Sequence, residues 1–164
     1  MRWALSGLLL LSLDVPAPPA GCPEPAQRQF DFWIGDWTVT DSAGAQTFGH
    51  NLVTLEEAGC LIHEHWTGQG GGTGQSFNYY EPSATEWRQI WVASRGTVLQ
   101  LAGGLVGSSM VLTGKGGSTA GSPASMDRIA WTPEPDGRVR QQWSTSTDSG
   151  RTWQVTFDGW YRKP

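Results

Sequence analysis

Hydrophobic and polar residues alternate with a period of two through most of the chain after the first forty residues, and no stretch of helix length repeats with a helical period. Such alternation indicates strands that bury one face, and the Gly, Pro, Asp and Ser residues between the stretches indicate tight turns. One helical turn is expected earlier, at Phe30–Ile34. The pattern predicts about ten strands, at Trp37–Asp41, Gly49–Glu56, Cys60–Thr67, Gln75–Tyr80, Trp87–Ser94, Val98–Ala102, Ser109–Thr113, Arg128–Trp131, Arg138–Ser146 and Thr152–Tyr161.

Short strands that follow one another with tight turns favour an antiparallel meander. A meander of this length has two edges, and closing it into a barrel removes both. The sequence therefore predicts an all-β fold, a roughly ten-stranded antiparallel β-barrel with a short helical turn at its N-terminus. A β-sandwich is the second possibility.

One turn carries a specific signature. Residues 146–153 match the S-x-D-x-G-x-x-W pattern of the Asp-box turn found in sialidase-type propellers. We expect Asp148 to accept backbone N–H bonds, Gly150 to take a positive φ, and Trp153 to pack beneath the turn. A propeller would need repeated copies, and the chain has one, so the motif predicts a structural device without catalytic meaning.

Several of the more apolar strand faces carry one polar side chain among aromatic ones, because residues two apart share a face. An unpaired buried polar group costs about 1–3 kcal/mol, so we expect these polar side chains to meet at one level inside the barrel. The rows are Cys60-Ile62-Glu64-Trp66, Ser76-Asn78-Tyr80, Trp87-Gln89-Trp91-Ala93 and Val139-Gln141-Trp143.

Two interpretations of this layer remain open. A small-ligand pocket is mostly apolar with a few converging polar groups, whereas a self-satisfied hydrogen-bond network would only specify the core. The first interpretation predicts an exported binding module for a small, largely apolar or aromatic molecule. Its candidate ligand-binding residues are Glu64, Trp66, Asn78, Tyr80, Gln89, Trp91, Gln141 and Trp143. The alternatives are a hydrolase or isomerase that uses Glu64 as an interior base, and a cavity-free structural or interaction domain.

Charge and composition exclude some other classes. Fifteen acidic against eleven basic residues give a net charge of -4, which disfavours nucleic-acid binding. No apolar run is long enough for a membrane-spanning helix. His63 and His65 share a strand face, but the only other histidine is His50. We therefore expect exposed histidines and neither a metal site nor a cofactor. A catalytic constellation is not evident.

The N-terminus has the features of an export signal. Met1-Arg2 gives a positive start, Trp3–Leu13 is an apolar stretch too short to anchor in a bilayer, and small residues follow at Ala20. The expected organisation is a signal peptide at residues 1–21, a tail with the helical turn at 22–35, and the barrel at 36–164. The mature protein would be periplasmic or extracellular.

The chain has two cysteines, Cys22 and Cys60. An even number in an exported protein favours a disulfide, which would tie the tail to the barrel. The rival interpretation is a lipid anchor at Cys22, because Ala20-Gly21-Cys22 resembles the end of a lipoprotein processing site. Pro19 stands where that motif takes a Leu-like residue.

The segment Phe30-Asp31-Phe32-Trp33-Ile34-Gly35-Asp36-Trp37 resembles the opening of a group of uncharacterised bacterial secreted domains with an F-D-F-W-x-G-x-W motif, which are regarded as lipocalin-like. Later segments agree, namely Gly59-Cys60, Glu64–Thr67, Asn78–Pro82, Trp87–Val92 and Asp158-Gly159. The resemblance to lipocalins and other calycins implies that Trp37 closes one barrel end and packs against Arg162. It implies a fold rather than an activity, and no haem-ligating histidine can be placed.

Overall fold

The computed structural model describes residues 21–116 and 125–164. The predicted signal peptide, apart from Gly21, lies outside the described residues. Within the described part, no helix is both long and apolar enough to cross a membrane.

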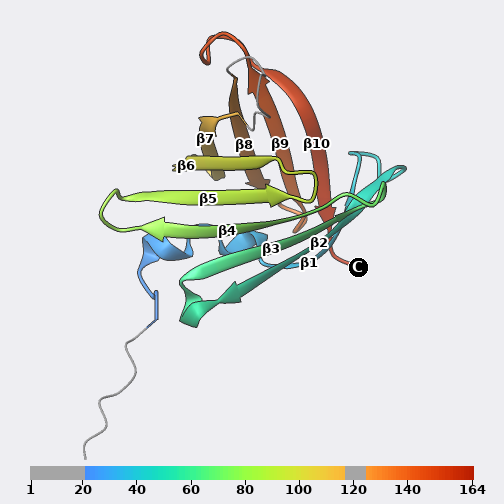
Figure 1. Cartoon of the computed structure of the whole chain (residues 1–164). Coiled ribbons are helices and arrows are strands. Elements are labelled where there is room, and N and C mark those ends of the chain that lie inside the picture. Colours follow the sequence, from blue (N-terminus) through green and yellow to red (C-terminus); the bar gives the residue numbers. More distant parts are fainter. Residues whose placement is uncertain (1–20, 117–124) are drawn as a thin grey trace, which may run out of the picture.

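The described chain folds into a closed, ten-stranded antiparallel barrel (Figure 1). Each strand pairs with its neighbours in sequence, and the first strand pairs with the last. The predicted all-β meander barrel is thereby confirmed. Its strands are β1 (Gly35–Thr40), β2 (Thr47–Glu56), β3 (Leu61–Gly68), β4 (Thr73–Glu81), β5 (Glu86–Ala93), β6 (Val98–Val106), β7 (Ser109–Lys115), β8 (Met126–Pro133), β9 (Val139–Ser146) and β10 (Gln154–Arg162).

Bulges lie next to the seam where the barrel closes. The β1–β2 register shifts between Val39 and Thr40, and the β10–β9 register shifts between Val155 and Phe157. A bulge bends its strand and increases the local twist. The seam itself is short, because β1 and β10 have three residue pairs in register.

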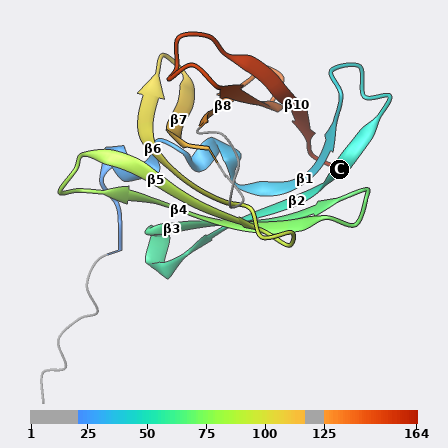
Figure 2. The same ribbon diagram turned by 45° about the horizontal axis from the view of Figure 1, so that its top comes forward.

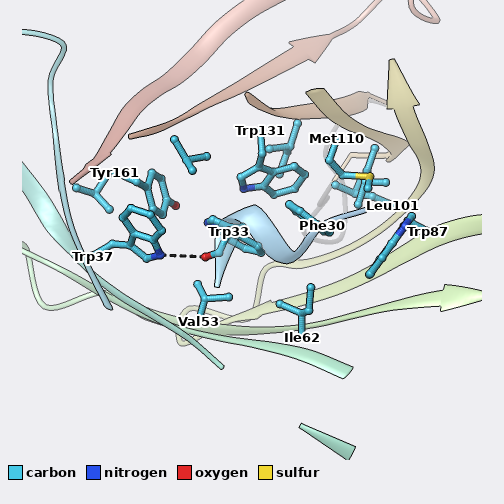
Figure 3. Close-up of a cluster of buried hydrophobic side chains, with 14 of the residues drawn as sticks. Phe30, Trp33, Trp37, Val53, Ile62, Trp87, Leu101, Met110, Trp131 and Tyr161 are labelled. Atoms are coloured by element: carbon cyan, nitrogen blue, oxygen red, sulfur yellow. Dashed lines mark hydrogen bonds between the residues drawn. The ribbon is translucent and has the colours of Figure 1, made fainter. Parts of the chain in front are cut away.

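Three short 3-10 helices accompany the strands, η1 (Pro25–Arg28), η2 (Asp31–Trp33) and η3 (Glu57–Gly59). Figure 2 shows the blue N-terminal segment inside the ring of strands. Phe30 and Trp33 are fully buried, and their rings stack at 5.0 Å between centroids. They also contact the rings of Trp87 and Trp131, as Figure 3 shows. The predicted helical turn is therefore an aromatic plug that fills one end of the barrel.

Trp37 is buried beside this plug, but its cationic partner differs from the prediction. The Nζ atom of Lys163 lies 5.3 Å from the centroid of the Trp37 ring. Arg162 instead donates from Nε to Thr40 Oγ1 at 3.0 Å. The assignment of Arg162 as the stacking partner is wrong because Tyr161 points inward. Because side chains alternate along a strand, Arg162 then points outward and the next residue, Lys163, covers the Trp37 ring.

A disulfide joins Cys22 to Cys60, as the cysteine count predicted. The bond connects the tail before η1 to the residue after η3, and the Cys22 backbone N–H also donates to Ala58 O at 3.3 Å. The N-terminal segment that carries the plug is thereby held to the barrel wall.

The Asp-box turn between β9 and β10 has the expected geometry. Asp148 accepts hydrogen bonds from the Thr152 backbone N–H at 2.9 Å and from the Thr152 hydroxyl at 2.7 Å. These bonds lower the Asp148 pKa to about 2. Gly150 has a φ of 85°, and the Trp153 indole donates to its carbonyl oxygen at 3.0 Å. The motif is a structural hairpin here.

Candidate functional site

The barrel interior has two halves of different character. The half around the plug is a packed aromatic and aliphatic core, in which the Trp33 and Trp131 rings lie 5.2 Å apart. Beyond it the interior holds a cavity of about 180 Å³. A layer of hydrogen-bonded polar side chains lies between the core and this cavity.

The first arm of the polar layer begins at a backbone carbonyl. Asn78 Nδ2 donates to Ile62 O at 3.1 Å, and because a carbonyl can only accept, Asn78 Oδ1 is left to accept from Gln89 Nε2 at 2.8 Å. Asn78 Nδ2 also donates to Ser76 Oγ at 2.9 Å. The Ser76 hydroxyl in turn donates to Glu64 Oε2 at 2.6 Å. Gln89, Asn78 and Ser76 thus form a chain of hydrogen bonds that ends at Glu64.

The second arm runs from Glu64 to the other side of the barrel. Asn51 Nδ2 donates to Glu64 Oε1 at 2.8 Å and to the Tyr161 hydroxyl at 3.1 Å. The Tyr161 hydroxyl donates to Gln141 Oε1. Gln141 on β9 is therefore linked to Gln89 on β5 through one continuous network.

All four polar residues singled out from the sequence belong to this network, namely Glu64, Asn78, Gln89 and Gln141. The sequence argument missed two members, Asn51 and Tyr161, and did not identify Ser76 as the link. Asn51 had the same signal as the others, a polar residue two positions from a buried valine on β2. The opposite face of β2 carries the apolar Leu52, so the sequence did not show which face of this strand is buried.

The cavity lies above the network and is walled mainly by aromatic rings. Trp66, Trp91 and Trp143 are half-buried there and make no ring stacking with one another among the described residues. The lining residues are Glu64, Trp66, Gln89, Trp91, Leu99, Ile129, Gln141, Trp143, Phe157 and Tyr161.

Six of the eight predicted ligand-binding residues line the cavity, and two do not. Asn78 is fully buried behind Gln89, where it orients the Gln89 amide. Tyr80 packs edge-on against Trp87 at 6.2 Å, on the core side of the network. Tyr80 was predicted to line the cavity because it shares the inward face of β4 with Asn78. Along the barrel axis, however, it lies beside the plug.

The indole rings of the wall are held in place by neighbouring strands. A Cβ atom at Gly49 would lie 2.7 Å from Trp66 Cη2, so the ring lies directly over the glycine. Gly74 lies under Trp91 in the same way. Trp143 is fixed differently, because its Nε1 donates to Asp127 Oδ1 at 2.9 Å. The rings are thus kept against the wall, and the space between them stays open.

Glu64 determines the electrostatics of the site. It is 4% exposed, and burial raises its pKa to about 7, although the hydrogen bonds from Ser76 and Asn51 act in the opposite direction. Burial and the neighbouring Glu64 charge raise the Tyr161 pKa well above its ordinary value. Among the described residues, no arginine, lysine or histidine lines the cavity.

One polar atom beneath the cavity floor has no hydrogen-bond partner in the described structure. This atom is the buried Gln89 Oε1. Its orientation is fixed because Gln89 Nε2 is committed to Asn78. A buried acceptor without a partner costs free energy and leaves negative potential at the cavity floor.

The outer face of β3 carries a separate cluster. His63 Nδ1 lies 3.2 Å from Glu56 Oε1, and His65 Nε2 lies 3.2 Å from His63 Nδ1. The His63 side chain is 13% exposed and packs against Phe77, so its assignment to open surface is wrong. The part of the chain that the structure describes contains no group of three side chains able to hold a metal ion.

The sequence matches no protein-family model and no curated protein. The structure establishes the fold, a ten-stranded antiparallel barrel. The likeness to lipocalin-like secreted domains rests on the sequence motifs alone.

Proposed function

We propose that this protein is an exported, lipocalin-like barrel that binds one small, largely apolar molecule between Trp66, Trp91 and Trp143. The observation that carries the proposal is the cavity of about 180 Å³, which three separately held indole rings wall on a polar floor. A site that is mostly apolar with a few converging polar groups is the usual form of a small-ligand pocket.

The volume of the cavity limits the size of the ligand. Pockets for drug-sized molecules occupy roughly 300–1,000 Å³, which is larger than this one. A cavity of about 150 Å³ in another protein holds benzene. The ligand part that enters the barrel is therefore about one ring or a compact branched group in size.

Export is supported by the Cys22–Cys60 disulfide, because such bonds form and persist in oxidising compartments. The N-terminal signal-like segment supports the same location. In this proposal the mature protein acts in the periplasm or outside the cell, and Cys22 is bridged rather than lipidated.

Catalysis by Glu64 is less well supported than binding. A pKa of about 7 suits a general base. However, Glu64 is the only carboxylate among the described residues that line the cavity, and the nearby Ser76 hydroxyl already donates to it. Neither a second acid nor an activated nucleophile accompanies it there, so binding is the function the geometry supports best.

The proposal is tested by filling the cavity. Leu99 lines it, whereas the preceding Val98 is 46% exposed on the same strand. Binding of indole is followed by the chemical shifts of the tryptophan N–H groups. We expect binding to wild type and Val98→Trp, and its loss in Leu99→Trp. Ile129→Phe, a second filling variant, should lose binding as well.

Circular dichroism checks that each variant is folded. Failure of wild type to bind indole or any other ring-sized or compact branched molecule would overturn the proposal, and so would unchanged binding in both folded filling variants. Native mass spectrometry of protein purified without denaturation would then identify any retained natural ligand.

A further inference from the structure

Glu64 is a buried carboxylate that has only neutral hydrogen-bond partners in the described structure. Its two oxygens accept from Asn51 Nδ2 at 2.8 Å and from Ser76 Oγ at 2.6 Å. His63 influences it through the wall, from the outer face of β3. A buried charge is normally paired with an opposite charge or a metal, because desolvation is costly. A buried carboxyl without such a partner stays neutral until its raised pKa is passed, and a cation in the cavity would stabilise its ionised form.

The network around Glu64 suits the ionised form. Ser76 Oγ accepts from the Asn78 amide and donates to Glu64 Oε2. Asn51 supplies an N–H to the other oxygen. Both carboxyl oxygens act as acceptors in this arrangement, as expected for a carboxylate.

The cavity walls add a second attraction for positive charge. The faces of aromatic rings carry negative charge density and attract cations within about 6 Å, tryptophan most strongly. The rings that line this cavity belong to Trp66, Trp91, Trp143, Phe157 and Tyr161, and none of them shows a cation over it in the described structure. The unpartnered acceptor Gln89 Oε1 contributes further negative potential.

We infer that the ligand of this cavity is a small organic cation, whose ammonium group pairs with Glu64 and lies within the cage of Trp66, Trp91 and Trp143. The inference rests on the proposed function and deepens it, because it assigns a positive charge to the small, largely apolar ligand. A compact methylated ammonium group matches both the apolar walls and the single carboxylate. A metal ion does not, because the other lining groups are mainly rings rather than oxygen ligands.

Isothermal titration with two isosteric probes, choline and 3,3-dimethylbutan-1-ol, tests the inference directly. The two differ mainly in the charge of the branched group. Wild-type protein at pH 8 should bind choline about tenfold more tightly than the neutral alcohol. Glu64→Gln should reduce choline affinity by about tenfold and leave the alcohol unchanged. Glu56→Gln, which removes a carboxylate from the outer face, should alter neither.

The outcomes separate this inference from the proposed function. Equal affinity for the two probes, or choline binding that Glu64→Gln does not weaken, overturns the cation while leaving a small-ligand barrel intact. If indole binds and both probes fail, the same conclusion holds. If all three fail, the proposed function fails as well. Should Glu64→Gln not fold, Trp91→Leu must lose the preference for choline over the alcohol.

Discussion

The six-membered ring of Trp91 lies over Gly74 on the neighbouring strand, in the place that a Cβ atom at position 74 would occupy. Trp91 is paired with Ser76 in the β4–β5 register, so the ring reaches diagonally along the wall toward the glycine. The absence of one methyl group on β4 thus keeps the indole out of the barrel centre. This relationship is one reason the cavity exists.

We predict that Gly74→Ala pushes the Trp91 ring into the cavity and weakens indole binding. Overpacking of this kind costs about 1–3 kcal/mol of the free energy of unfolding. Gly104→Ala on β6 is the matched control, because nothing lies within 4 Å of an added Cβ there. Urea denaturation and indole titration of the two variants provide the measurement. Normal indole affinity in folded Gly74→Ala would show that Trp91 has room elsewhere.

Period-two alternation was sufficient to predict the barrel, because each strand buries one face and the turns between strands are short. The same alternation predicted that Glu64, Gln89 and Gln141 point into the barrel, because each lies two positions from an apolar residue on its strand. Their convergence followed from the cost of an unpaired buried polar group, and the network confirms that they meet.

Other features depend on positions along the barrel axis, which alternation does not give. Tyr80 and Trp66 both occupy inward faces, yet one lies at the plug and the other at the cavity. The position of each residue along the barrel axis depends on how far neighbouring strands are offset from one another. The plug was predicted only as a helical turn, because the depth to which Phe30 and Trp33 insert depends on the whole barrel. The prediction that Arg162 packs against Trp37 failed for a local reason, the inward orientation of Tyr161.

The two halves of the interior should respond differently to loss of an indole. Trp131 is fully buried against Phe30 and Trp33, so Trp131→Leu should lower the free energy of unfolding by about 3 kcal/mol or more. Trp91 borders open space, so Trp91→Leu should cost less stability and lose ligand affinity. Chemical denaturation and indole titration measure the two effects. Equal stability losses would contradict the division into core and pocket.

Removal of the disulfide should loosen the attachment of the plug. The Cys22–Cys60 bond closes a loop with a sequence separation of 38, and loss of such a bond costs about 2–5 kcal/mol. We expect Cys22→Ser with Cys60→Ser to melt at a lower temperature, measured by calorimetry. Intact-mass measurement of the exported wild type should show two hydrogens fewer than the reduced chain. An added lipid mass on Cys22 would refute the bridge in the cell.

Stability should fall as pH rises through the range in which Glu64 titrates. The pKa of Glu64 is raised by burial from its ordinary 4.5 to about 7. Between these values the folded state holds a proton that the unfolded chain has released, so the free energy of unfolding decreases as pH rises. The decrease begins near pH 4.5, reaches about 3 kcal/mol near pH 7 and then levels off. Urea denaturation at intervals of pH measures it.

Comparison with Glu64→Gln isolates this effect, because His63, which acts on Glu64 from the outer face of β3, is present in both proteins. Asn51 on β2 and Ser76 on β4 do not titrate, and the pKa of Tyr161 on β10 is raised well above its ordinary value, so it stays neutral. Glu64→Gln should therefore show a flatter profile between pH 4.5 and 7. Glu56→Gln should keep the wild-type slope there, because the pKa of this outer carboxyl is lowered rather than raised. Matching profiles for wild type and Glu64→Gln would contradict a raised Glu64 pKa, because the folded protein would then hold no extra proton in this range.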